Sequence, residues 1–289
     1  MQITAFCKHC IKTEAMGKKI LKQIEETVEY LRKQYKHKPS VGIVLGSGLG
    51  SFVDHIEVEK EVAYADIPHF PVSTVEGHKG KLIFGKLSGK TVVAMAGRFH
   101  YYEGYGAQDV VYPIRVMKFL GIETLLLSNA AGGVNTSYQV GDIMIIRDHV
   151  SFFTPNPLIG KNTSEFGPRF PDMSEPYRKQ LITKAKEIAA ANGFEVKEGV
   201  YVAVTGPTFE TRAEYKLIQV LGGDVVGMST VQEAIVANHM GLKVFAASVV
   251  TDVGIRDAEN IITHEEVLEA AKAAEPKLAT LFRELAASL

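Results

Sequence analysis

Short apolar runs alternate with amphipathic segments along most of the chain, and this alternation constrains the fold more than any other feature. Runs rich in Val, Ile and Leu predict strands at 41–46, 81–85, 91–96, 123–128, 142–147, 198–204, 224–227 and 243–250. Apolar residues at helical spacing predict helices at 16–36, 107–119, 175–191, 210–220, 230–239 and 264–286. Such strands separated by helices indicate an α/β fold, a three-layer sandwich whose largely parallel or mixed central sheet is flanked by helices.

The chain shows no sign of division into several domains. Its 289 residues lie near the upper limit for a single hydrophobic core, and no repeat or linker-like stretch interrupts it. We expect one domain over residues 16–289, preceded by a disordered extension over residues 1–15. The only cysteines, Cys7 and Cys10, form a C-x-x-C motif in this extension, and without a second pair they cannot complete a tetrahedral zinc site.

Overall charge and hydropathy exclude several kinds of partner. The formal net charge of −1 at pH 7 offers no basic surface for nucleic acid or for an anionic membrane. No apolar run approaches the length of a membrane span, and the N-terminus lacks the pattern of a secretory signal. The nine histidines show no metal-binding spacing such as H-E-x-x-H. We expect a soluble cytoplasmic protein that needs no metal.

A glycine-rich turn, Gly46-Ser-Gly-Leu-Gly50, follows the apolar run at 41–45. The dinucleotide fingerprint G-x-G-x-x-G requires a sixth glycine, but Ser51 stands there, and the G-K-[ST] ending of a P-loop is missing. A bare glycine cluster of this kind is often only a tight turn. Ser47 nevertheless places a hydroxyl between two glycines, where it can donate to a small oxyanion.

Polar residues follow five other apolar runs, and each lies close behind a predicted strand. These residues are Arg98 with His100, Asn129, Glu210, Ser229 and Asp252. In open α/β sheets ligands bind outside the carboxyl ends of the strands, so these side chains and Ser47 are expected to converge. Taken singly, Arg98 reads as a surface ion pair and Asp252 as a helix N-cap. Taken together, an arginine, a histidine and two hydroxyls indicate an anion site.

A series of motifs between residues 40 and 270 closely resembles the trimeric purine nucleoside phosphorylases. In chain order these motifs are GSGLG, GHKGKLIFG, GRFHYYEGY, NAAGGVN, GDIMIIRDH, GPTFET and VGMSTVQEAIVANHMGL. The resemblance implies a pentosyltransferase of purine salvage that converts a purine nucleoside and inorganic phosphate into the free base and ribose 1-phosphate. It also implies a homotrimer that uses no metal or organic cofactor.

The same resemblance implies a role for each matching residue. Phosphate would be bound by Ser47, His78, Arg98, His100, Asn129, Ala130 and Ser229. Ribose would be held by Tyr102, Met228, His264 and, from a neighbouring subunit, Phe166 in the proline-rich loop 154–172. The base would be surrounded by Ala131, Phe209, Glu210, Val226, Thr251 and Asp252. The catalytic residues implied are His100, Glu210 and Asp252.

One residue departs from the family pattern. Members specific for 6-oxopurines usually carry asparagine where this chain has Asp252. A carboxylate repels a 6-oxo group and accepts from a 6-amino group, although a protonated aspartic acid would still donate to N7. Inosine and guanosine are the expected substrates, and an adenosine or methylthioadenosine phosphorylase is the alternative. A nucleoside-binding protein without turnover and a nicotinamide-dependent oxidoreductase are the other hypotheses.

Overall fold

The computed structural model describes residues 3–72, 74, 79–255 and 263–289, with the backbone alone for residues 3–16 and 18. Its described strands are β1 (Val41–Val44), β2 (Glu57–Ala63), β3 (Lys81–Leu87), β4 (Lys90–Ala96), β5 (Thr124–Gly133), β6 (Ile143–Val150), β7 (Lys197–Ala203), β8 (Val225–Gly227) and β9 (Lys243–Val253). Its described α-helices are α1 (Ile3–Gln34), α2 (Ala107–Val110), α3 (Tyr112–Leu120), α4 (Lys179–Ala191), α5 (Arg212–Val220), α6 (Val231–His239) and α7 (His264–Ala287). Short 3₁₀ turns lie at Gly50–His55, Tyr64–Asp66 and Tyr101–Glu103.

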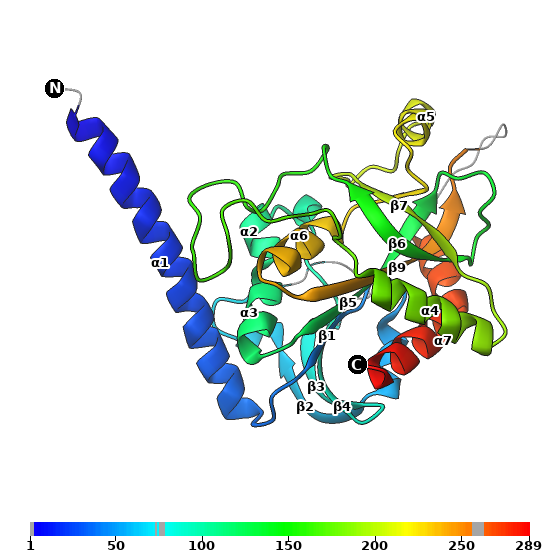
Figure 1. The fold of residues 1–289 in the computed structure, drawn as a ribbon, viewed down its shortest axis with the longest axis horizontal. Coiled ribbons are helices and arrows are strands. Elements are labelled where there is room, and N and C mark those ends of the chain that lie inside the picture. The colour runs from blue at the N-terminus through cyan, green and yellow to red at the C-terminus, as the bar shows by residue number, and fades with distance from the viewer. Residues whose placement is uncertain (1–2, 73, 75–78, 256–262) are drawn as a thin grey trace.

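The strands form one mixed sheet in the order β2-β3-β4-β1-β5-β8-β7-β6-β9. Because β9 also pairs with β5, the last five strands close into a ring. β1 runs parallel to β4 and β5, whereas β2, β3 and β4 form an antiparallel edge. Helices α1, α3 and α6 pack together at one side of the sheet, and α4 packs on α7 at the other (Figure 1). The expected α/β sandwich with a mixed central sheet is confirmed.

Burial explains why the central strands read as continuous apolar runs. All four residues of β1 are buried, and residues 124–129 of β5 are buried as well. A strand covered by helices on both faces has no solvent side, so it needs no polar alternation. The β3–β4 hairpin predicted from the Leu87-Ser-Gly-Lys90 turn is present, with Leu87 opposite Lys90. None of the helices within the described ranges combines the length and the apolar character that a bilayer crossing requires.

Three elements differ from the sequence-based expectation. The edge strand β2 was not predicted, because its exposed residues Glu57–Glu61 are mostly charged, as suits an edge that must not pair with another chain. The helix expected at 107–119 is divided into α2 and α3, with Pro113 in the first turn of α3. Helix α1 begins at Ile3 and so includes residues 3–15, where the sequence predicted no helix; the run contains no proline or glycine to stop a helix before Gly17.

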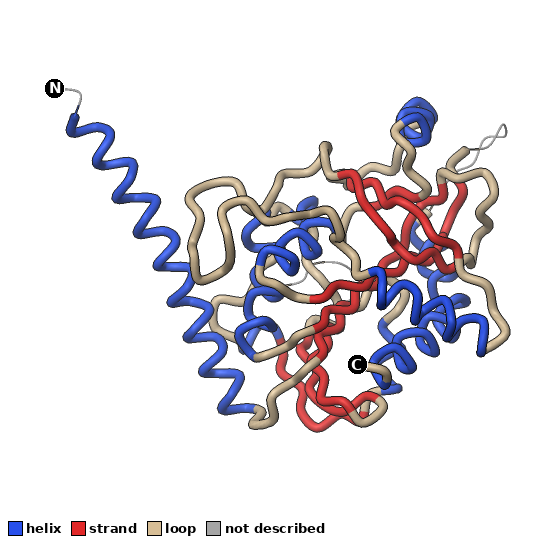
Figure 2. Tube along the Cα trace, in the orientation of Figure 1, coloured by secondary structure: helices blue, strands red, loops and turns tan. Residues whose placement is uncertain are grey.

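A long segment without helix or strand, residues 151–178, joins β6 to α4 and includes the proline-rich loop. It appears in tan above α2 and α6 in Figure 2. Two side chains of α6 donate to its carbonyl groups: Gln232 Nε2 lies 2.9 Å from Pro155 O, and His239 Nε2 lies 2.9 Å from Pro168 O. These hydrogen bonds hold the segment against α6, although the segment itself contains no helix or strand.

Candidate active site

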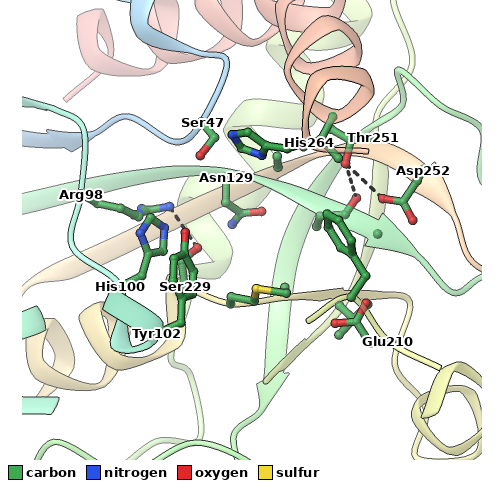
Figure 3. Close-up of a pocket in the computed structure, with 18 residues that line it drawn as sticks. Ser47, Arg98, His100, Tyr102, Asn129, Glu210, Ser229, Thr251, Asp252 and His264 are labelled. Carbon is green, nitrogen blue, oxygen red and sulfur yellow. Dashed lines mark hydrogen bonds between the residues drawn. The ribbon is translucent and has the colours of Figure 1, made fainter. Parts of the chain in front are cut away.

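One cavity gathers side chains from every strand end that the sequence singled out (Figure 3). Its lining residues are Ser47, Arg98, His100, Tyr102, Asn129, Ala130, Ala131, Gly132, Phe209, Glu210, Val226, Gly227, Met228, Ser229, Thr251, Asp252, His264 and Val267. Strands β5 and β9 run further than expected, so Asn129 and Asp252 belong to the strands themselves. Gly132, Gly227 and Val267 also line the cavity and were not singled out from the sequence; they carry no polar side chain that would mark them.

The glycine-rich turn after β1 lies against β5. A Cβ atom on Gly46 would come within 2.7 Å of the Asn129 Cα atom, so only glycine allows this close approach. Gly48 has a φ of +75°, a conformation that favours glycine, whereas Gly50 faces open space. The turn continues into a short 3₁₀ helix of six residues, Gly50–His55, and not into a long helix. The glycines thus fit the turn onto the sheet and leave Ser47 at the cavity.

Arg98 is buried within the site, with only 1% of its surface exposed. Its Nε and Nη2 atoms donate to the two carboxylate oxygens of Glu233, at 3.2 and 3.0 Å. Its Nη1 atom lies 2.7 Å from Ser128 O and 3.2 Å from Ser229 Oγ. These hydrogen bonds fix the guanidinium in one orientation. An ion pair on the surface, which is what Arg98 suggests when it is taken singly, would not fix it in this way. Glu233, in α6, had not been singled out.

Thr230 connects the residues around this arginine. Its φ of +69° is unusual for a β-branched residue and marks local backbone strain at the start of α6. Its hydroxyl accepts from Asn129 Nδ2 at 2.9 Å and lies 3.1 Å from Ser229 Oγ. The buried Oδ1 atom of Asn129 has no hydrogen-bond partner among the described residues, so it is available to accept from a ligand.

His100 is oriented by a neighbouring carboxylate. Its Nδ1 atom lies 3.1 Å from Glu103 Oε1, and its ring stacks on Tyr102 with 4.7 Å between the centroids. Burial lowers the pKa of His100, and the positive charge of Arg98 lowers it further, against the opposing pull of Glu103. Burial also opposes ionisation of Glu103, but hydrogen bonds from His100 and Thr74 outweigh it and lower the pKa of Glu103 to about 2. At neutral pH the pair is therefore a neutral imidazole beside a carboxylate.

The opposite end of the cavity carries two carboxyl groups. Burial raises the pKa of Glu210, and the charge of nearby Asp252 adds to the effect. Asp252, at the end of β9, is 8% exposed and accepts from Tyr215 Oη and Thr251 Oγ1, each at 3.3 Å. Thr251 Oγ1 also lies 3.3 Å from Ala131 O. Figure 3 shows Glu210 and Asp252 together, apart from Arg98 and Ser47.

Two of the sequence-predicted residues are not found in the cavity. His78 lies outside the described residues. Phe166 is buried in its own chain, with its ring 4.4 Å from the Arg115 guanidinium and packed on Phe119. Phe170, in the same segment, is 86% exposed. The contact of Phe166 with a second subunit stays a prediction, and it would require this ring to leave its present packing.

Comparison with known proteins gives this fold and site a family. The family model described as "Phosphorylase superfamily" matches residues 40–287, which contain every described strand. The purine nucleoside phosphorylase 1 of Geobacillus stearothermophilus is 53% identical over 246 residues, covering 85% of this chain and 90% of that protein. The chain is thus a member of the phosphorylase superfamily.

Solved structures narrow the family further. A purine nucleoside phosphorylase isoform of Schistosoma mansoni, in complex with cytosine and ribose 1-phosphate, matches with a TM-score of 0.88 and 44% identity, covering 93% of this chain and 96% of that one. Another from the same organism, in complex with adenosine, matches with a TM-score of 0.88 and 41% identity over 93% of this chain and 97% of that one. The chain belongs to the purine nucleoside phosphorylases.

Proposed function

We propose that this protein catalyses the reversible phosphorolysis of purine nucleosides to free base and ribose 1-phosphate, using inorganic phosphate as a co-substrate. The observation that carries the proposal is that one cavity joins an end built for an anion to an end built for a purine. At the first end lie Ser47, Ser229 and the fixed guanidinium of Arg98. At the second lie Glu210 and Asp252, whose carboxyl oxygens can accept from ring N–H or amino groups.

The geometry suits a reaction in which charge separates between sugar and base. Cleavage of the bond between the sugar and the base passes through an oxocarbenium-like state, and a phosphate held beneath the sugar stabilises its positive charge. Holding phosphate and the anomeric carbon at near-attack distance supplies roughly 7–11 kcal/mol in favourable cases. Glu210, when ionised, would accept from N1–H of a 6-oxopurine. Tyr102, Met228 and His264, which line the same cavity, would hold the ribose.

The assembly that we propose is a cytoplasmic homotrimer whose sites lie at subunit interfaces. Support comes from the exposed apolar side chains of the segment 151–178. Phe152 and Phe170 are each 86% exposed and Ile159 is 76% exposed, which is costly on a free surface. Because Phe166 is buried, Phe170 is the better placed ring for reaching a second subunit. No organic cofactor or metal is proposed; among the described residues no group of three or more His, Cys, Asp or Glu side chains could hold a metal ion.

A second candidate within the same chemistry is an adenosine or methylthioadenosine phosphorylase. Asp252 favours it, because two hydroxyl groups donate to its carboxylate and so support the ionised, accepting form. Base release from inosine, guanosine, adenosine and methylthioadenosine would rank the substrates. Adenine release faster than hypoxanthine release would promote the second candidate.

The test of phosphorolysis is to measure base release with and without phosphate. We expect release to require phosphate and to yield ribose 1-phosphate. Ser47→Ala should raise the KM for phosphate about tenfold through the lost hydrogen bond to a charged group, while the KM for nucleoside changes little. Ser51→Ala, an exposed serine four residues on, is the matched control and should behave as wild type. Release that proceeds equally without phosphate, or no release at all, would contradict the proposal.

A further inference from the structure

Tyr215 lies behind the purine end of the cavity without lining it. It lies in the first turn of α5 and is 4% exposed. Reciprocal hydrogen bonds between Thr211 and Glu214, a capping box, cap the N-terminus of this helix. Its hydroxyl is directed at Asp252, with Oη 3.3 Å from Oδ2. A buried phenol seeks a partner for its O–H, and a carboxylate is the strongest acceptor available. Tyr215 therefore joins α5 to the end of β9 through the one side chain that departs from the family pattern.

The surrounding backbone leaves room for this ring at two glycines. A Cβ atom on Gly254 would lie 2.1 Å from the Tyr215 ring, so any larger residue would push the ring away. A Cβ atom on Gly132 would lie 3.1 Å from Asp252 Oδ2 and 3.3 Å from Tyr215 Oη. The Tyr215 hydroxyl and the Asp252 carboxylate thus meet beside glycine backbone that carries no side chain. The space left by the missing Cβ atoms fixes where each of the two groups points.

The charges around Tyr215 make it a donor at every physiological pH. Burial raises the pKa of Tyr215 far above its ordinary value, and the charges of Asp252 and Glu210 raise it further. The phenol has a single proton, which the carboxyl groups of Asp252 and Glu210 can each accept, and donating it favours the ionised form of the carboxyl group that accepts it. The second donor, Thr251, acts in the same direction.

We propose that Tyr215 is a specificity-determining positioning residue: it holds Asp252 as an ionised acceptor facing the base, and so favours purines with an amino group at C6 over those with an oxo group. An amino group donates to such a carboxylate, whereas an oxo group would face it lone pair to lone pair. The inference rests on the proposed function, because it names the class of purine that the same site selects.

The test compares kcat/KM for adenosine and inosine in four proteins: wild type, Tyr215→Phe, Asp252→Asn and the double variant. Without the phenol hydroxyl, Asp252 takes up a proton more readily and can donate to N7 or O6. The ratio of adenosine to inosine should therefore fall about fivefold in Tyr215→Phe, which corresponds to about 1 kcal/mol, the net contribution of one typical hydrogen bond. In the Asp252→Asn background the same substitution should change the ratio much less, because the Asp252 carboxylate is gone and only the hydrogen bond of Tyr215 to Glu210 remains.

Matched controls separate positioning from a general loss of packing. Tyr177→Phe removes another buried tyrosine hydroxyl, which bonds His149 Nδ1 at 3.0 Å, and it should not move the ratio. Gly254→Ala should displace the Tyr215 ring and lower the ratio as Tyr215→Phe does. A ratio unchanged in Tyr215→Phe, or a shift of undiminished size beside Asp252→Asn, would overturn the inference. If no nucleoside released base, the proposed function would fail, and calorimetric binding of adenine and hypoxanthine to the same variants would still decide the role of Tyr215.

Discussion

The two ends of the cavity use ionisable groups in opposite ways. At the anion end, Arg98 is paired with Glu233 and His100 with Glu103, so each group that faces the ligand has a counterpart behind it. At the purine end two carboxyl groups, Glu210 and Asp252, lie near each other, and the hydroxyl groups of Tyr215 and Thr251 donate to Asp252.

This difference shows which end can be altered without loss of the fold. Each member of the buried Arg98–Glu233 ion pair is costly alone, so this part of the anion end tolerates few changes. Hydroxyl donors around a carboxyl group adjust its protonation by smaller amounts, so the purine end can change its preference through one donor. The predictions below test this contrast in order of expected size.

The largest effect is expected from Glu233→Gln, which leaves the guanidinium of Arg98 buried without its counter-charge. We expect a loss of about 3–5 kcal/mol of folding stability and a fall of about 10²–10³ in kcat/KM. Added phosphate should raise the melting temperature more than in wild type, because the ligand replaces part of the missing charge. Thermal unfolding with and without phosphate measures this.

Glu187→Gln, which breaks an exposed pair with Lys184 at 3.2 Å, should change stability by less than about 1 kcal/mol. Equal losses of folding stability in Glu233→Gln and Glu187→Gln would contradict the special role of the buried ion pair at the anion end.

A smaller effect is expected from Glu103→Gln at the same end. The folded-state pKa of Glu103, about 2, lies below its ordinary value of 4.5, so the carboxylate stabilises the protein fully above about pH 4.5 and progressively less toward pH 2. The variant should lose stability mainly at neutral pH and approach wild type at pH 2–3. Its kcat/KM should fall about tenfold, because His100 loses its orienting partner. Urea unfolding at pH 3 and pH 6 checks the sign, and a deficit that does not shrink at pH 3 would refute it.

The smallest effect, and one of opposite sign, is expected from Glu210→Gln at the purine end. The folded-state pKa of Glu210 is raised, so its ionised form costs stability as the pH rises through that pKa, and the protonated form costs none below its ordinary range. The variant should be more stable than wild type at pH 7, by less than about 1 kcal/mol for this partly exposed group, with a smaller difference at pH 4. Melting temperatures at the two pH values test this, while inosine turnover should fall through the lost acceptor. A variant less stable than wild type at pH 7 would show that the two ends do not differ in this way.

Much of this arrangement could be predicted from local sequence. The apolar runs identified eight of the nine strands of the sheet, and the turn at Leu87–Lys90 identified a hairpin. Polar residues placed just behind those runs pointed to a shared cavity, and for β1, β4, β5 and β9 the reason is that parallel strands bring their carboxyl ends to one edge. Strands β7 and β8, which precede Glu210 and Ser229, run antiparallel to β5, so this rule does not explain their position. The motifs then supplied a role for each residue, from Ser47 to His264.

The partners of those residues could not be predicted, because they lie far away in the sequence. Glu233 is 135 positions from Arg98, and Tyr215 is 37 positions from Asp252. An acidic residue within the apolar helix 231–239 is a signal that Glu233 needs a partner, but it does not identify which. Phe166 and Phe170 stand four positions apart in similar surroundings, and only packing distinguishes the buried ring from the exposed one.

The pairing of β5 with β9 determines the direction in which the Asp252 side chain points. The register between them shifts by one residue, since Ala131 pairs with Val250 but Gly132 pairs with Asp252, which leaves Thr251 as an extra residue. Side chains alternate between the two faces of a strand, so an irregularity of this kind re-aims the residues that follow it. The face of the sheet to which Asp252 points thus depends on whether the number of preceding residues in β9 is odd or even. Inserting or deleting a single residue in β9 would turn the Asp252 side chain to the opposite face.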